Sequence, residues 1–186
     1  MPSIYLENEN LLIHPFRPDD LQRYDELVSE VFAILSDEDT LKYIPEKRLL
    51  SISHAENWLQ GTIINFHSGR NRVHFITSKK NGRLIGLIDI IPPAVAREYY
   101  TLSRYPFFIE FYLKGSAKGK AVMTNLLPLV IAYLKAEGIE NVAAVVNRRN
   151  YAASKVLRRS GFIFQSGFDP NQDLYAMTLL SEKPAA

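Results

Sequence analysis

The chain has 186 residues, of which 47% are hydrophobic, so it can bury one good core but is short for two domains. Its 22 basic and 20 acidic side chains leave a net charge of +2, which is too small to indicate a nucleic-acid partner or an acidic polymer substrate. The chain contains no cysteine, which excludes disulfides, a thiol nucleophile and a cysteine-based zinc site.

The N-terminal part of the chain predicts a hairpin and two helices. Apolar patches on either side of a polar stretch predict a strand or hairpin over 4–16. After Pro18, apolar residues recur at steps of three and four, which predicts an amphipathic helix over about 19–35. The run Ser53-His54-Ala55-Glu56 has the pattern of a capping box and predicts the start of a second helix.

A second hairpin is predicted in the middle of the chain. Two apolar stretches at 73–77 and 84–91 predict its strands, and Asn81-Gly82 between them predicts a type I′ turn. The pair Pro92-Pro93 ends the second strand. The sequence does not predict a defined structure for the aromatic and basic connection over 94–105.

The remaining elements alternate between strands and helices. We expect strands at about 107–113, 142–146, 162–166 and 174–180, and helices at about 119–137 and 150–159. Pro128 lies inside the longer of these helices, where it should kink or loosen the helix. The order of elements predicts one α/β domain over 1–180, with 181–186 as a disordered tail.

The run 107–124 reads as a strand, a loop of small and basic residues, and the first turn of a helix. This order directs several backbone N–H groups and the positive end of a helix dipole toward one point, which predicts a site for phosphate or pyrophosphate. The stretch from Gly115 to Ala121 also resembles a nucleotide P-loop. Against that, its glycines are separated by three residues and not four, and Ala121 stands where a magnesium-binding hydroxyl is required. Only magnesium-dependent ATP binding would favour a nucleotide kinase.

Two segments in the second half carry a family pattern. The first is Ser116-Ala117-Lys118-Gly119-Lys120-Ala121 before the long helix, and the second is the set Asn150, Ala153, Gly161 and Phe162. Their order and spacing resemble the GNAT superfamily of N-acetyltransferases, in particular the branch that includes the ribosomal-protein N-terminal acetyltransferases. Ser116 departs from the family pattern, which has Gln or Arg there. The resemblance implies a single GNAT-like domain whose mixed, mostly antiparallel sheet has about seven strands and is flanked by about four helices.

The resemblance also implies that the chain binds acetyl-CoA as a cosubstrate, with its pyrophosphate on residues 117–122. The positions that match the family's cofactor-binding residues are Phe111, Leu113, Ala117, Lys118, Gly119, Lys120, Ala121, Val122, Asn150 and Ser154. Two structural alternatives stay open: Gly119 and Ala121 could serve only tight strand–helix packing, and Asn150 could serve as a helix N-cap. No metal site is expected, because the four histidines share no metal-ligand spacing.

The family's reaction is direct attack of an amine on the thioester carbonyl, which needs a base, an oxyanion donor and a proton for the leaving thiolate. Glu110 is the first candidate for the base, since it is a carboxylate in an otherwise apolar and aromatic strand, and Asp89 is the second. Glu110 could instead bind the substrate amine or pair with an arginine. Many family members place a tyrosine acid at the position of Leu157, so that acid is absent here. The remaining candidates for the acid are Tyr112, Tyr151 and Ser154.

The acceptor is expected to be a small-molecule amine or a protein N-terminus, entering over 35–50 and the stretch around 97–105. A non-catalytic acetyl-CoA-binding regulatory module is the alternative function. The sequence shows neither a secretory signal pattern nor an apolar run long enough to span a membrane. We therefore expect a cytoplasmic monomer or homodimer without nucleic-acid or membrane partners.

Overall fold

A computed structural model of the chain describes residues 3–179, which contain eight strands and six α-helices. The chain divides into two compact units, unit 1 with Met1–Ile90 and Glu110–Val122, and unit 2 with Ile91–Ile109 and Met123–Ala186. The predicted tail at 181–186 lies outside the described residues, and the domain boundaries 1–180 stay a prediction. No helix in the described part of the chain combines the length and apolar character that crossing a membrane requires.

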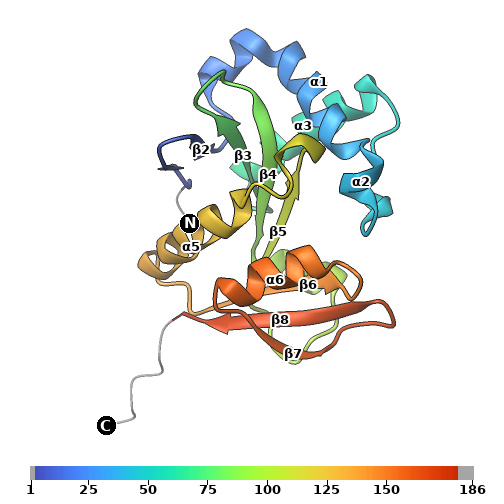
Figure 1. Ribbon diagram of the computed structural model, residues 1–186, viewed down its shortest axis with the longest axis vertical. Helices are drawn as coiled ribbons and strands as arrows, with labels where there is room; N and C mark the ends of the chain where they lie inside the picture. Colours follow the sequence, from blue (N-terminus) through green and yellow to red (C-terminus); the bar gives the residue numbers. More distant parts are fainter. Residues whose placement is uncertain (1–2, 180–186) are drawn as a thin grey trace. The chain divides into compact units, whose positions relative to one another are not determined.

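Unit 1 is built on strands that hydrogen-bond side by side in chain order (Figure 1). They are β1 (Leu6–Glu7), β2 (Leu11–His14), β3 (Arg72–Ser78), β4 (Leu84–Ile91) and β5 (Phe107–Leu113), of which unit 1 holds the second half. The pairs from β1 to β4 are antiparallel. The predicted hairpins over 4–16 and 73–91 are therefore confirmed.

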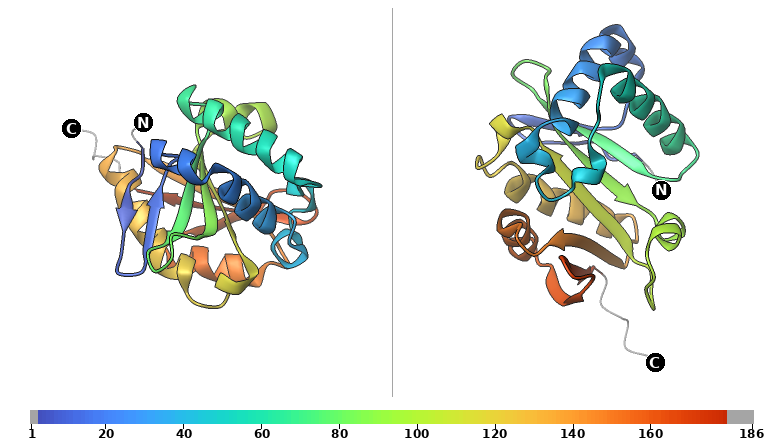
Figure 2. Two further views of the ribbon diagram at one scale, coloured as in Figure 1. Left: turned by 90° about the horizontal axis from the view of Figure 1, so that it is seen from above. Right: turned by 90° about the vertical axis from the view of Figure 1, so that its right-hand side faces the viewer.

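The helices of unit 1 follow the first hairpin and lie over the sheet. They are α1 (Tyr24–Leu35), α2 (Glu38–Leu41) and α3 (Ile52–His67), with single 3₁₀ turns at Pro18–Arg23, Pro45–Lys47 and, after β5, Gly115–Ala117. Helices α1 and α3 pack against each other and against the strands (Figure 2). Their apolar stripes, with Val31 and Leu59 fully buried, meet Phe75 and Leu87 of the sheet and form the core of this unit.

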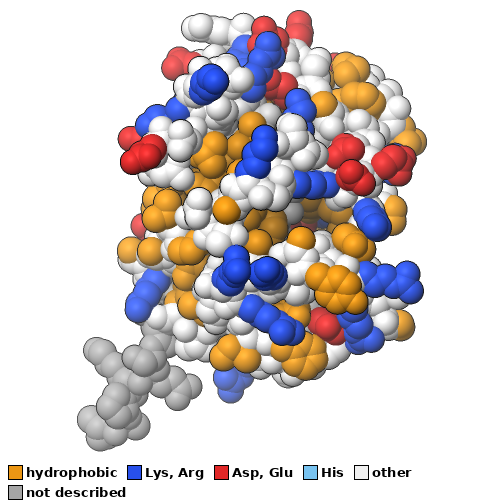
Figure 3. Space-filling model, in the orientation of Figure 1, with side chains coloured by type: hydrophobic (Ala, Val, Ile, Leu, Met, Phe, Trp, Pro, Cys, Tyr) orange, Lys and Arg blue, Asp and Glu red, His pale blue; other side chains and the backbone are white. Residues whose placement is uncertain are grey.

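Unit 2 combines the first half of β5 with the C-terminal elements. These are α4 (Pro93–Tyr99), α5 (Val122–Ala136), β6 (Asn141–Asn147), α6 (Tyr151–Arg159), β7 (Ile163–Gly167) and β8 (Gln172–Thr178). The strand order is β5-β6-β8-β7, in which β5 and β6 are parallel and the other pairs are antiparallel. Phe108 of β5 packs with Ala96 and Ala143 in the core. Lys and Arg side chains gather over α6, where Lys155 and Arg159 are exposed (Figure 3).

The predicted α/β class with a mixed, mostly antiparallel sheet is confirmed. The predicted number of helices was wrong, as were the predicted starts of α1, α3 and α5. Six α-helices replace the expected four, because the short α2 and the proline-initiated α4 lack a periodic apolar stripe long enough to be detected. Helix α1 begins at Tyr24, since the residues from Pro18 form a 3₁₀ turn and Arg23 has a non-helical backbone. Helix α3 is capped by Ser51 and not by Ser53, because the Ser51 hydroxyl accepts the His54 N–H.

The turn of the second hairpin also differs from the prediction. A type I′ turn needs a positive φ at both Asn81 and Gly82, and only Gly82 has one. The loop is longer than two residues: the Gly82 N–H donates to the Ser78 carbonyl, and the Ser78 N–H donates to the Arg83 carbonyl. Asn81 uses its side chain instead, accepting the Arg83 N–H at 3.2 Å, which closes the turn without a left-handed backbone at Asn81.

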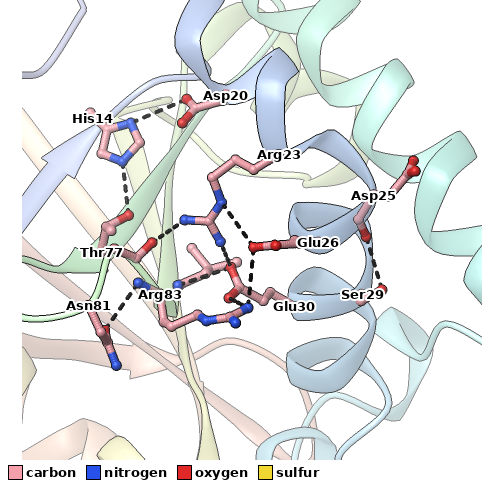
Figure 4. A network of polar contacts seen from close by, with 12 residues as sticks. His14, Asp20, Arg23, Asp25, Glu26, Ser29, Glu30, Thr77, Asn81 and Arg83 are labelled. Atoms are coloured by element: carbon pink, nitrogen blue, oxygen red, sulfur yellow. Dashed lines mark hydrogen bonds and ion pairs between the residues drawn. The ribbon is translucent and has the colours of Figure 1, made fainter.

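A buried carboxylate, Glu30 of α1, ties the helices of unit 1 to this hairpin (Figure 4). Its Oε2 accepts from the Arg23 guanidinium and, at 3.1 Å, from the Leu84 N–H, while its Oε1 accepts from Arg83 Nη1 at 3.1 Å. The Arg23 guanidinium also donates to the Gly82 carbonyl. Glu30 is only 9% exposed, so each of these groups depends on it for charge or hydrogen-bond compensation.

We expect Glu30→Ala to lower the free energy of unfolding by about 3 kcal/mol or more, because breaking a buried ion pair leaves the other charge uncompensated. Denaturant titration measures this effect. Glu26→Ala is the matched control: Glu26 faces the same two arginines but its side chain is 59% exposed, so its loss should cost less than about 1 kcal/mol. Equal losses in the two variants would contradict the role of Glu30 as the buried carboxylate that holds α1 to the hairpin.

Candidate active site

The predicted base Glu110 lies in the middle of β5 with its carboxylate fixed from two sides. Its Oε2 accepts from the Lys47 ammonium at 3.0 Å and from the Tyr112 hydroxyl. Glu110 and Tyr112 are two residues apart in a strand, so they share one face of the sheet. Lys47 lies far from Glu110 in the sequence and is the last residue of the 3₁₀ turn Pro45–Lys47. Pairing with an arginine was one alternative for Glu110, and in the structure its charged partner is a lysine.

The ammonium of Lys47 keeps its charge although it is partly buried. Burial opposes the charged form, but the charge and hydrogen bond of Glu110 outweigh it, with a further contribution from Asp89, so the pKa of Lys47 is raised. The side chain remains 41% exposed, against 24% for Glu110. The ammonium of Lys47 is therefore charged at neutral pH, and both side chains are open to an incoming molecule.

The second predicted base, Asp89, lies in the neighbouring strand β4 and is buried. Its Oδ1 accepts the Arg72 N–H at 3.1 Å and its Oδ2 accepts from Asn71 Nδ2 at 3.4 Å. Burial, and then the charge of Glu110, raise the pKa of Asp89 from 3.8 to about 7. Near neutral pH, Asp89 is therefore close to half protonated and can exchange a proton with its surroundings.

The perturbed pKa of Asp89 predicts a pH dependence of stability. The folded state holds the Asp89 proton more tightly than the unfolded chain, so this contribution to the free energy of unfolding falls between about pH 4 and about pH 7. Burial of His74 acts in the opposite direction, since it lowers the pKa of His74 from 6.5 to about 4 and adds stability as pH rises. In Asp89→Asn only the rising contribution remains, so denaturant titration should show a steeper rise with pH than in the wild type. Parallel curves would contradict the raised pKa.

Close contact between β4 and β5 positions the end of β5. A Cβ at Gly86 would lie 2.6 Å from both the Tyr112 carbonyl oxygen and Leu113 Cδ2, so only glycine fits there. At the end of the strand, the Lys114 N–H donates to the Ile85 carbonyl at 2.9 Å. These contacts fix the direction in which the chain leaves β5 and enters the loop.

The loop from Gly115 to Val122 has a backbone suited to an anion. Gly119 has a φ of 72° and Ala121 a φ of 57°, and Ala121 is the one non-glycine residue with a positive φ among the described residues. Successive N–H groups in a turn that contains left-handed residues can point toward one side and form a concave anion-binding site. Helix α5 begins at Val122, so the predicted helix start at 119 was wrong, because these positive φ angles are incompatible with a right-handed helix.

Helix α2 contacts the same strand end through Asp37 and Thr40. The Thr40 hydroxyl lies 2.9 Å from the Leu113 carbonyl and 2.7 Å from Asp37 Oδ2, and it donates its one hydrogen to either. Asp37 Oδ2 also lies 3.3 Å from the position of a Cβ at Gly115. The Thr40 hydrogen bond, and more weakly the Lys118 charge, lower the pKa of Asp37. These contacts therefore hold the segment 35–50, over which the acceptor is expected to enter, next to the end of β5 and the start of the loop.

The other predicted site residues lie in unit 2 or on the loop surface. Asn150 is the N-cap of α6, where its Oδ1 accepts the Ala153 N–H at 3.1 Å, and Ser154 is half-buried in the same helix. Lys120 is exposed. Cofactor binding by these residues stays a prediction.

Sequence reasoning missed Lys47, Asn71 and Thr40. Lys47 is 63 residues away from Glu110, and neither the turn that carries it nor its neighbours has a motif. The helix-start signal Asp37-x-x-Thr40 was a local hint for Thr40 alone. Within residues 3–179, no cluster of three or more His, Asp or Glu side chains is arranged to hold a metal ion.

Comparison with known proteins places these features in context. Residues 10–163 match the family described as acetyltransferase (GNAT) domain. No curated protein matches the sequence. Among solved structures, a GNAT-family acetyltransferase from Bacillus anthracis has a TM-score of 0.70 at 17% identity, over 95% of this chain and 99% of that one. Ribosomal-protein-S5-alanine acetyltransferase from Vibrio fischeri has a TM-score of 0.69 at 16% identity, over 97% and 100%. The microcin C7 self immunity acetyltransferase MccE, in complex with acetyl-CoA and AMP, has a TM-score of 0.66 at 14% identity, over 92% and 93%.

Proposed function

We propose, because the chain belongs to the GNAT acetyltransferase family, that it transfers the acetyl group of acetyl-CoA to the amine of a small molecule or a protein N-terminus. The observation that carries this proposal is the fixed carboxylate of Glu110, on a strand that continues directly into the loop with left-handed residues. In this proposal, β5 carries the proton acceptor Glu110, and the loop that begins at Gly115, five residues further along the chain, provides the anion site.

The loop fits a pyrophosphate. Nothing lies within 4 Å of the position of a Cβ at Gly119, and both Gly119 and Ala121 are exposed, which supports access of a ligand to this part of the loop. In the proposed complex, the N–H groups from Gly119 to Val122 bind the pyrophosphate, and Lys118 and Lys120 add positive charge. Acetyl-CoA supplies the acetyl group as an activated thioester.

Glu110 then acts as the general base. It takes a proton from the acceptor ammonium, directly or through one water, and the neutral amine attacks the thioester carbonyl. Glu110 releases this first proton to water, the N–C bond forms and the C–S bond breaks, and the second proton that leaves the nitrogen as it becomes an amide balances the proton that the thiolate receives. Tyr112 holds the carboxylate through Oε2 and is the nearest hydroxyl from which that proton can come. A backbone N–H at the end of β5 is the proposed donor to the oxyanion.

The test is an amine panel. The purified protein is incubated with acetyl-CoA and amino acids, polyamines, amino sugars or peptides with free N-termini, and thiol release is measured together with acetylated product. We expect release that depends on one class of amine. Binding of acetyl-CoA without acetylation of any amine would favour the regulatory module instead.

A further inference from the structure

The active site already contains a primary amine of the chain itself. Lys47 Nζ lies 3.0 Å from Glu110 Oε2, the atom pair that a bound acceptor ammonium and its base would form. The Lys47 side chain is 41% exposed, so an acetyl donor can approach it. The ion pair also means that an external acceptor has to compete with Lys47 for Glu110.

We propose that Lys47 is a site of self-acetylation, modified from acetyl-CoA by the chain's own Glu110 when no external acceptor is bound. This inference rests on the proposed function, because Glu110 must act as the base. The Lys47 nitrogen forms a bond to the acetyl carbon, and the C–S bond breaks with its electron pair on sulfur. Two protons leave the Lys47 nitrogen as the ammonium becomes an amide: Glu110 takes the first and releases it to water before the attack, and then takes the second from the acylated nitrogen and passes it to the thiolate.

The charges around Lys47 determine how fast we expect its self-acetylation to be. Three carboxylates face it, Glu110 from β5, Asp89 from β4 and Glu46 from its own turn, and their charges keep its pKa raised against the effect of burial. Only the neutral amine attacks a thioester, so self-acetylation should be slow at neutral pH and become faster as pH rises. Acetylation removes the charge, which breaks the ion pair and releases Oε2 of Glu110.

Lys79 provides a matched internal control. It is also 41% exposed and also pairs with a carboxylate, Glu7, at 2.9 Å. Glu7 belongs to β1, at the opposite end of the strand order of unit 1 from β5, and nothing links it to the loop. Because the pKa of Lys47 is raised, its spontaneous acetylation by acetyl-CoA should be no faster than that of Lys79, and any excess at Lys47 reports catalysis.

The experiment incubates the full chain with acetyl-CoA alone and follows acetylation of each lysine by peptide mass spectrometry. We expect acetylation of Lys47 to be about tenfold or more faster than that of Lys79, and to fall to the rate of Lys79 in Glu110→Gln. An added acceptor amine should slow it, which tests the inference without any variant. Thermal melting of Glu110→Gln checks that this variant folds.

Equal rates at the two lysines in the wild type would overturn the inference. If external amines are acetylated under the same conditions, the proposed function survives that result. If neither Lys47 nor any external amine is acetylated, both fail. Acetylation of Lys47 that persists unchanged in Glu110→Gln would also overturn the inference, since the carboxylate would have no part in it.

Discussion

Glu110→Gln should reduce kcat for acetyl transfer by about 10²-fold or more while leaving the affinity for acetyl-CoA within about twofold of the wild type. The amide keeps the shape of the side chain and accepts the Tyr112 and Lys47 hydrogen bonds through its oxygen, so the fold of β5 should survive. It cannot accept a proton from the acceptor. Steady-state kinetics and calorimetric titration with acetyl-CoA separate the two effects.

Glu46→Gln is the matched control for this variant. Glu46 lies next to Lys47 and is exposed, and its replacement removes the same charge from the same neighbourhood. Its kcat should stay within about twofold of the wild type, because screened surface charges have small effects. A similar loss of kcat in both variants would show that net charge matters here and that Glu110 is not the base.

Gly119→Val should weaken acetyl-CoA binding by about tenfold or more. A φ of 72° costs an L residue about 1–2 kcal/mol, and more for a β-branched one, so the loop would leave the conformation that turns its N–H groups outward. Since nothing lies within 4 Å of a Cβ there, the loss comes from the backbone and not from a steric clash with a neighbour. Calorimetry with acetyl-CoA measures the change.

Gly69→Val provides the same backbone strain away from the loop. Gly69 follows α3, has a φ of 74° and also has nothing within 4 Å of a Cβ position. Both variants should lose similar stability in thermal melting, but only Gly119→Val should lose affinity. If Gly69→Val weakens binding equally, the effect reports global destabilisation and the loop is not the pyrophosphate site.

The elements of the fold followed from local sequence signals where those signals were strong. The continuous apolar stretches of β3 and β4 and the apolar period of α1 and α3 are dense enough to be detected without tertiary information. The predicted boundaries of helices and turns were wrong where two local hydrogen-bonding arrangements compete. Ser51 and Ser53 both suit an N-cap, and the His54 N–H bonds to only one of them. Asn81 suits a left-handed turn position but also an Asx hydrogen bond, and the structure uses the latter.

The site was predictable in part for a different reason. Glu110 and Asp89 stand out as carboxylates in otherwise apolar strands, and the loop residues stand out as a run of small and basic side chains. The partner of Glu110 was not predictable, because a long-range ion pair leaves no periodic or local trace in the sequence. The left-handed backbone of Ala121 was equally hidden, since alanine ordinarily avoids a positive φ.

The central claim is that the chain moves an acetyl group from acetyl-CoA to an amine with Glu110 as the base. The most direct measurement is a parallel assay of wild type and Glu110→Gln, in which thiol release and acetylated amine are quantified in the same reaction. We predict equal amounts of the two products in the wild type, dependent on the amine, and a rate lower by about 10²-fold in the variant. Thiol release without acetylated amine, or an unchanged rate in Glu110→Gln, would contradict the account.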